Sequence, residues 1–244
     1  MKDQTKKFES QIKKLTEGKS KEEKDQLLRD WEELATNGDV ETQYLLGLYH
    51  EQLQDYERAI TWYQRAIENK SPEAINALGY LYLNGEGVDK DVDKAFELFS
   101  QAAEEYDLDC AYFNLAGMYL DGTGCEQNTE KGMSLFEKSM ELGDGCAALM
   151  LGRIYLKGLL GFNVSYRKAA KYFEKGFKLG NFECIMYLLD IYAGLYSFGM
   201  QDWKKHKKLL KIYDTLERPN YPIYHETPII PMDIYKKLKK ANLL

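Results

Sequence analysis

The chain has 244 residues, of which 44% are hydrophobic and 30% are charged, as is ordinary for a soluble globular protein. Its formal charge of −6 at pH 7 argues against a general nucleic-acid binder, because a phosphate backbone needs a basic footprint. No apolar run approaches the roughly 18 residues that span a bilayer, and the charged start MKDQTKKFESQIKKL lacks the apolar centre of a signal peptide. We therefore expect a cytoplasmic protein without a transmembrane segment.

Residues 1–38 are predicted to form a helical cap at the N-terminal end of the chain. Ser20 and Glu23 have the spacing of a capping box, which starts a helix. Three large apolar residues follow at helical spacing, as on the packing face of a helix: Leu27, Trp31 and Leu34. A stack of repeated units needs such a terminal unit to cover its exposed end.

Between residues 39 and 216, a two-part block recurs about every 37 residues. The first part begins at Leu78, Leu115, Leu151 and Leu188, which lie 37, 36 and 37 residues apart. Both parts place apolar residues at steps of three and four, which predicts one helix for each part. The five predicted repeats are residues 39–70, 71–107, 108–144, 145–180 and 181–216. Each repeat should consist of a helix A, an elbow and a helix B, which bury their apolar faces by stacking.

The elbow of the second repeat, Gly85-Glu86-Gly87, could also belong to a phosphate-binding loop. Such a loop should follow a β-strand, whereas here a helix precedes it. The carboxylates of Asp89, Asp91 and Asp93 would also repel a phosphate. The pattern returns at Gly122 and Gly124, so we interpret it as a helix C-cap glycine in a left-handed conformation followed by a turn glycine.

These residues resemble the Sel-one-like repeat, a relative of the tetratricopeptide repeat with a longer elbow. The resemblance rests on Leu78-Gly79-x-x-Tyr82-x-x-Gly85-x-Gly87-Val88-x-x-Asp91-x-x-Lys94-Ala95-x-x-x-Phe99. The first repeat is shorter and lacks the Gly-x-Gly elbow, so it looks more like a tetratricopeptide repeat. The fifth repeat replaces the small residue of helix B with His206 or a neighbour. The resemblance implies an all-α, right-handed superhelical solenoid of antiparallel helix-turn-helix repeats.

Residues 217–244 differ from the repeats because four prolines fall within thirteen residues, at positions 219, 222, 228 and 231. We predict an extended tail that ends in a short helix from about Pro231. From Asp202 onward, ten Lys/Arg and five Asp/Glu give a net charge of +5. This basic end is either a solvated face or a contact for an acidic partner or an anionic membrane surface.

No catalytic constellation or metal site stands out in the sequence. His50, His206 and His225 lie in different segments, and none is spaced with a second ligand as a metal site requires. The four cysteines form no CxxC pair and are expected to pack as small hydrophobic residues. We therefore predict no catalytic residue, no metal and no cofactor, and a protein that is not an enzyme.

Binding of a protein or peptide is the predicted function. In a stack of helical hairpins, the A helices line a concave surface. By similarity to tetratricopeptide units, the residues facing this groove lie three before, one after and four after the glycine of the Leu-Gly pair. The predicted groove residues are Gln43, His50, Asn76, Tyr80, Leu83, Phe113, Leu120, Leu149, Arg153, Leu156, Met186 and Asp190.

This mixture of aromatic, aliphatic, amide and charged groups suits an extended peptide or a partner helix, with Tyr and Arg as anchors. The tail could cover part of the same surface. The predicted role is a scaffold or adaptor. Two alternatives stay open: a dedicated inhibitor or immunity-type protein that masks one partner enzyme, and a hydrolase, since some members of the family are credited with hydrolytic activity.

Overall fold

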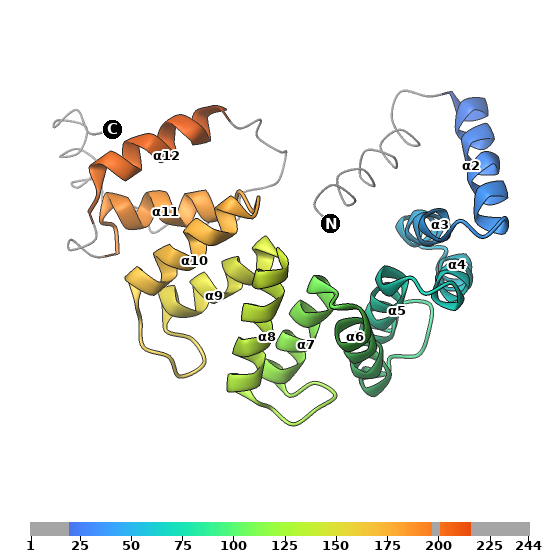
Figure 1. Cartoon of the computed structure of the whole chain (residues 1–244), viewed down its shortest axis with the longest axis horizontal. Coiled ribbons are helices and arrows are strands. Elements are labelled where there is room, and N and C mark those ends of the chain that lie inside the picture. Colours follow the sequence, from blue (N-terminus) through green and yellow to red (C-terminus); the bar gives the residue numbers. More distant parts are fainter. Residues whose placement is uncertain (1–19, 197–200, 216–244) are drawn as a thin grey trace. The chain divides into compact units, whose positions relative to one another are not determined.

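The structure is a computed structural model that describes residues 20–196 and 201–215 (Figure 1). Within these residues all regular structure is α-helical. The helices are α2 (Lys21–Thr36), α3 (Val40–Gln52), α4 (Tyr56–Glu68), α5 (Pro72–Asn84), α6 (Val92–Tyr106), α7 (Asp109–Asp121), α8 (Thr129–Leu142), α9 (Gly145–Lys157), α10 (Tyr166–Lys178), α11 (Cys184–Ala193) and α12 (Trp203–Thr215). The prediction of an all-α helical repeat solenoid is confirmed.

The chain divides into two compact units, residues 1–151 and 152–244, and the boundary falls within α9. In the first unit, α3 packs on α4, α5 on α6, and α7 on α8, so these helices form three hairpins. Contacts of α4 with α5 and of α6 with α7 join consecutive hairpins. In the second unit, α11 packs against both α10 and α12.

In the hairpins of α3 and α4, of α5 and α6, and of α9 and α10, a glycine of helix A lies against an aromatic ring of helix B. In the first unit, a Cβ atom added to Gly47 would lie 2.3 Å from Cε1 of Tyr63, whose side chain is fully buried. In the second unit, the same construction at Gly152 would bring the Cβ atom within 2.4 Å of Cε1 of Phe173. The helices therefore approach so closely that only glycine fits opposite the ring.

The elbows are turn devices, as predicted. Helix α5 is capped by Gly85 with φ +75° and helix α7 by Gly122 with φ +71°, both in the left-handed conformation. Gly87 and Gly124, two residues further on, also have positive φ angles.

One backbone hydrogen bond closes four of the elbows. In each case, the amide of the residue that caps helix B donates to the carbonyl oxygen of a tyrosine near the end of helix A. The bonds are Asp91 to Tyr82 (3.0 Å), Asn128 to Tyr119 (2.8 Å), Ser165 to Tyr155 (2.8 Å) and Asp202 to Tyr192 (3.1 Å). This bond fixes where helix B begins relative to helix A.

The N-terminal helix α2 starts as predicted, but its packing face is shifted by one residue. The capping box is present, with Ser20 N–H donating to Glu23 at 2.8 Å and Glu23 N–H donating to the Ser20 hydroxyl at 3.2 Å. The buried cluster here contains Ala35, with Leu28 and Trp31 packed against it, while Leu34 is 51% exposed. The reason is that Ala35 follows Trp31 by four residues, as Ala66 follows Trp62 in α4.

The predicted tail at residues 217–244, including His225, lies outside the described residues, as do residues 1–19 of the predicted cap. Among residues 20–196 and 201–215, no helix has the combination of length and apolar character that crossing a bilayer requires.

Candidate functional site

The A-helix face of the first unit combines one exposed aromatic ring with a pair of amide side chains. Tyr80 on α5 is 47% exposed. One turn before it lies Asn76, whose Oδ1 accepts a hydrogen bond of 2.9 Å from Nδ2 of Asn114 on α7. This bond links two neighbouring A helices. Leu83 and Phe113 are half-buried, and the Phe113 ring packs edge-on against Phe136 of α8 at 5.1 Å.

Gln43 is a correction to the predicted groove, because its side chain is buried and holds the fold together. Only 3% of the residue is exposed. Its Nε2 donates to the Ala35 carbonyl oxygen at 2.8 Å, and its Oε1 accepts from Asn69 Nδ2 at 3.1 Å. Gln43 thereby ties α3 to the end of α2 and to the end of α4.

His50 is also buried, at 3% exposure, and does not face a groove. Its Nδ1 has no hydrogen-bond partner and lies 3.7 Å from Oδ2 of Asp55, the residue that caps α4. Burial lowers the pKa of His50, although the Asp55 carboxylate opposes this shift. The imidazole is therefore held neutral inside the hairpin of α3 and α4.

Three other residues take the predicted groove positions in the first repeat. Counted from Gly47 by the same offsets as in the later repeats, these positions are Tyr44, Leu48 and Glu51. All three are half-buried. The Leu46-Gly47 pair in the sequence marks these positions. The predicted residues Gln43 and His50 each lie one residue before the positions counted from Gly47.

Three predicted leucines are likewise packed inside the fold. Leu120, Leu149 and Leu156 are 7%, 7% and 5% exposed. For Leu120 the contact is visible: a Cβ atom added to Gly132 of α8 would lie 2.7 Å from Leu120 Cδ2. Leu120 therefore faces helix B of its own hairpin, which corrects the prediction that it faces a partner.

In the second unit, the predicted residues Arg153, Met186 and Asp190 are half-buried. The ring of Tyr187 on α11 stacks on Phe173 with 4.7 Å between the centroids. Burial raises the pKa of the Tyr187 hydroxyl, and the nearby Arg153 cation partly offsets this. Arg153 thus lies close enough to act on α11 through its charge.

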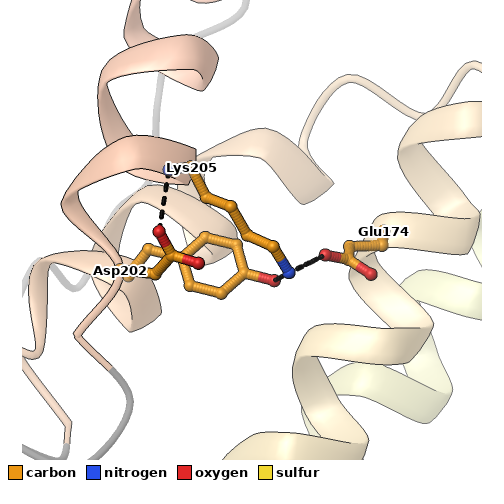
Figure 2. Close-up of polar contacts among 4 residues, drawn as sticks. Glu174, Asp202 and Lys205 are labelled. Carbon is orange, nitrogen blue, oxygen red and sulfur yellow. Dashed lines mark hydrogen bonds and ion pairs between the residues drawn. The ribbon is translucent and has the colours of Figure 1, made fainter.

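A second polar arrangement, at the end of the second unit, was missed by the sequence analysis (Figure 2). The Lys205 ammonium group lies 4.8 Å from the centroid of the Tyr192 ring and donates to Glu174 Oε1 at 3.1 Å and to the Tyr192 hydroxyl at 3.2 Å. The Tyr192 hydroxyl donates to the same Glu174 oxygen at 2.5 Å. Asp202 Oδ1 accepts a bond of 3.0 Å from the Lys205 backbone amide, which starts α12.

The charge on Glu174 is stabilised by these two donors. Partial burial by itself would raise the pKa of Glu174, but the hydrogen bonds from Tyr192 and Lys205 outweigh it and leave the pKa below its usual value. Lysines also lie over tyrosine rings in two preceding repeats, Lys131 over Tyr119 at 4.3 Å and Lys168 over Tyr155 at 4.6 Å. The signal in the sequence was the regular interval of 12 or 13 residues between Tyr and Lys.

Two cysteine thiols and the grouping of potential metal ligands were compared with what a nucleophile or a metal site requires. Burial raises the pKa of the Cys110 thiol to about 12 and also raises that of Cys125, so both thiols stay protonated at neutral pH. Within residues 20–196 and 201–215, no three His, Cys, Asp or Glu side chains are grouped as a metal ion would require. What these residues offer is hydrogen bonding and contact area.

Comparison with protein families identifies the repeated block. The model of the Sel1 repeat matches four stretches of the chain, residues 40–71, 72–107, 111–144 and 147–181. Together they cover more than half of its length.

This chain is similar to solved structures that contain the same repeat. A Sel1 repeat protein from Oxalobacter formigenes is 26% identical with a TM-score of 0.58, over 69% of this chain and 66% of that one. The protein c5321, a protective antigen of uropathogenic Escherichia coli strains displaying an SLR fold, is 26% identical with a TM-score of 0.52, over 76% of this chain and 44% of that one. A sel1 repeat protein from Klebsiella pneumoniae subsp. pneumoniae, 20% identical with a TM-score of 0.53 over 76% of this chain and 89% of its own, supports the fold alone.

Proposed function

The chain belongs to the Sel1 repeat family, and from that premise we propose that it is a non-catalytic scaffold or adaptor that binds an extended segment of a partner protein on its A helices. Sel1 repeat proteins are generally protein-interaction scaffolds. The proposed binding surface of the first unit consists of Tyr80, Asn76, Asn114 and Leu83 and is called the A-helix face below.

The observation that carries this proposal is the amide pair beside an exposed tyrosine. Asn114 uses one N–H to bond to the Asn76 oxygen, which leaves the Asn76 NH₂ group as a donor and the Asn114 carbonyl oxygen as an acceptor. A peptide backbone offers the complementary acceptor and donor at each residue. Recognition through the main chain would thus hold an extended segment against α5 and α7, with little demand on its side chains.

Tyr80 supplies the contact area that amide hydrogen bonds lack. Its ring is nearly half exposed, one turn after Asn76. A tyrosine has only two side-chain torsions to order on binding, so it gains buried area at low cost in entropy. In the second unit, Arg153, Met186 and Asp190 offer a separate set of charged and apolar groups, and we propose that they contact a partner in the same way.

The experiment is a comparison of proteins captured by the full chain and by variants of it. Tyr80→Ala combined with Arg153→Glu is expected to abolish capture of the wild-type partner, while Leu53→Ala should leave it intact. Leu53 is a suitable control because it is 60% exposed and lies just after α3, away from the A-helix face. Circular dichroism should show the same helix content for all three proteins.

Undiminished capture by the Tyr80→Ala, Arg153→Glu protein would contradict the proposal. The identity of the partner, read by mass spectrometry from the native cell, then separates the roles. An enzyme that loses its activity in a one-to-one complex would favour the inhibitor over the scaffold.

A further inference from the structure

We propose that the elbow of the third repeat binds the carboxylate of a glutamate side chain in a partner polypeptide, through Lys131 of α8 and Tyr119 of α7. The site is formed by the C-terminal turn of α7, the elbow that follows and the adjoining face of α6, all within the first unit. It is separate from the A-helix face and does not depend on the function proposed for that face.

The second unit shows what this lysine and tyrosine arrangement binds. There, Lys205 and Tyr192 both donate to one oxygen of Glu174, and Lys205 lies over the tyrosine ring (Figure 2). The carboxylate comes from α10, the helix that precedes the hairpin of α11 and α12. Two donors converging on one carboxylate oxygen, one of them charged, make a strong and directional interaction.

The third repeat has the same two donors but lacks the carboxylate. Lys131 donates to the Tyr119 hydroxyl at 2.6 Å and lies over its ring. Glu174 directly follows Phe173, the buried ring of α10, and the residue that directly follows Phe99, the buried ring of α6, is Ser100. Because the serine side chain is too short to replace a glutamate, the position that Glu174 fills in the second unit has no carboxylate here.

A hollow of about 430 Å³ lies beside Lys131 and Tyr119, with a volume in the range of ligand sites. Its lining includes Phe96, Tyr119, Gln127, Asn128 and Lys131. Phe96 lies one helical turn before Ser100 on α6, so the hollow adjoins the face of α6 that carries Ser100.

Lys131 is a cationic residue in the lining of this hollow. Among the described residues, no carboxylate lies within ion-pair distance of its ammonium group, whereas the corresponding Lys94 of the second repeat pairs with Glu97 at 2.9 Å. Since the Tyr119 oxygen accepts from Lys131, the hydroxyl proton remains available to a ligand. Glu126 also lines the hollow; both Glu126 and Lys131 are exposed, so solvent screens the two charges alike.

The surroundings favour a glutamate of a polypeptide over a small free carboxylate. The Phe96 ring packs edge-on against Tyr119 at 5.5 Å and gives an apolar wall for the methylene groups of the side chain. Gln127 donates to the Leu120 carbonyl oxygen at 2.6 Å, which leaves its own oxygen as an acceptor. Asn128 accepts from the Lys131 amide and keeps its NH₂ group as a donor, so the rim can bond to a peptide main chain.

The test is a nuclear magnetic resonance titration of the labelled full chain with acetyl-Gly-Glu-Gly-amide. Its controls are the isosteric acetyl-Gly-Gln-Gly-amide and acetate alone. The glutamate peptide is expected to shift the signals of Tyr119 and Lys131 and to bind roughly two- to fivefold more tightly than the glutamine peptide, which is the size of an exposed charge pair. Equal binding of the two peptides would overturn the proposal, and acetate binding as tightly as the glutamate peptide would overturn its assignment to a polypeptide.

Three variants locate the effect. Lys131→Gln should abolish the preference for glutamate, and Lys94→Gln, the matched lysine that already has a partner, should keep it. Ser100→Glu should place an internal carboxylate where Glu174 lies in the second unit, block the peptide and raise the Tm. The proposal is wrong if Ser100→Glu leaves peptide binding unchanged or if both lysine variants behave alike. Tyr80→Ala should not alter this titration, so the result is independent of the A-helix face.

Discussion

At the scale of single residues, two buried histidines replace residues that the other repeats keep: His50 takes the place of the tyrosine near the end of helix A, and His206 that of the small residue of helix B. His206 fills the small-residue position of α12, is 7% exposed and bonds through Nδ1 to the Leu189 carbonyl oxygen at 3.1 Å. Because a carbonyl oxygen only accepts, Nδ1 carries the proton. Burial lowers the pKa of His206, as it does that of His50, and the bond to Leu189 only partly opposes it.

These histidines predict a loss of stability on mild acidification. A histidine with a lowered pKa in the folded state binds a proton more readily when unfolded, so the free energy of unfolding is highest above the unfolded pKa of about 6.5 and falls as the pH drops through the folded value. We expect a loss on the order of 1 kcal/mol between pH 7.5 and 5.5, measured by urea unfolding.

The double variant His50→Gln, His206→Gln should flatten this dependence, whatever its stability at pH 7.5. Around His50, the charges of Asp55 and Glu32 favour protonation and that of Arg58 opposes it. An equally steep dependence in the double variant would show that other groups are responsible.

At the scale of elements, the elbow is also the place where consecutive hairpins meet. Gly87 follows α5 with φ +70°, and a Cβ atom there would lie 2.2 Å from Cβ of Tyr56, the first residue of α4. At Gly124, a Cβ atom would lie 2.7 Å from the carbonyl oxygen of Val92, the first residue of α6. The second glycine of the Gly-x-Gly pair thus lets each elbow rest on helix B of the preceding repeat.

Gly87→Ala is therefore expected to destabilise the protein by more than about 2 kcal/mol, because it combines backbone strain with a clash between packed elements. Gly161→Ala is the matched control, since Gly161 has φ +81° but nothing within 4 Å of an added Cβ atom. It should cost only the strain, about 1 kcal/mol. The measurement is the urea midpoint of each variant, and equal losses would mean that the contact with Tyr56 contributes nothing.

The sequence predicted the elements well and the individual side-chain environments less well. Period and glycine spacing were sufficient for the helices and elbows, because Gly85 and Gly122 supply the left-handed backbone conformation that ends a helix. The direction of a side chain on helix A depends on what helix B places beside it. Leu120 is buried because Gly132 leaves room for it, and no count along α7 alone contains that information.

At the scale of the whole molecule, a stack of repeats has few contacts between distant parts of the chain, so a change should weaken its own neighbourhood and little else. The link from Lys205 to Glu174 and Tyr192 joins α12 to α10 and α11. Both charged side chains are partly exposed, so each bond is weakened by solvent.

Lys205→Gln should raise amide hydrogen exchange in α12 by roughly two- to fivefold, corresponding to about 0.5–1 kcal/mol for such an exposed pair. Exchange in α3 to α8 should not change. Lys204→Gln, on the neighbouring exposed lysine, is the control and should leave α12 as in the wild type. Faster exchange throughout the chain would show that the repeats unfold as one cooperative body.

The bond between the tyrosine carbonyl and the capping amide spans segments of different length. Nine positions separate its partners in the second and third repeats, and ten separate them after Tyr155 and after Tyr192, yet the bond length stays between 2.8 and 3.1 Å. The additional residue therefore lies between the two bonded groups and leaves the bond itself intact. The segment between these two bonded groups is consequently where related proteins can gain a residue and still keep the hydrogen bond that sets the start of helix B.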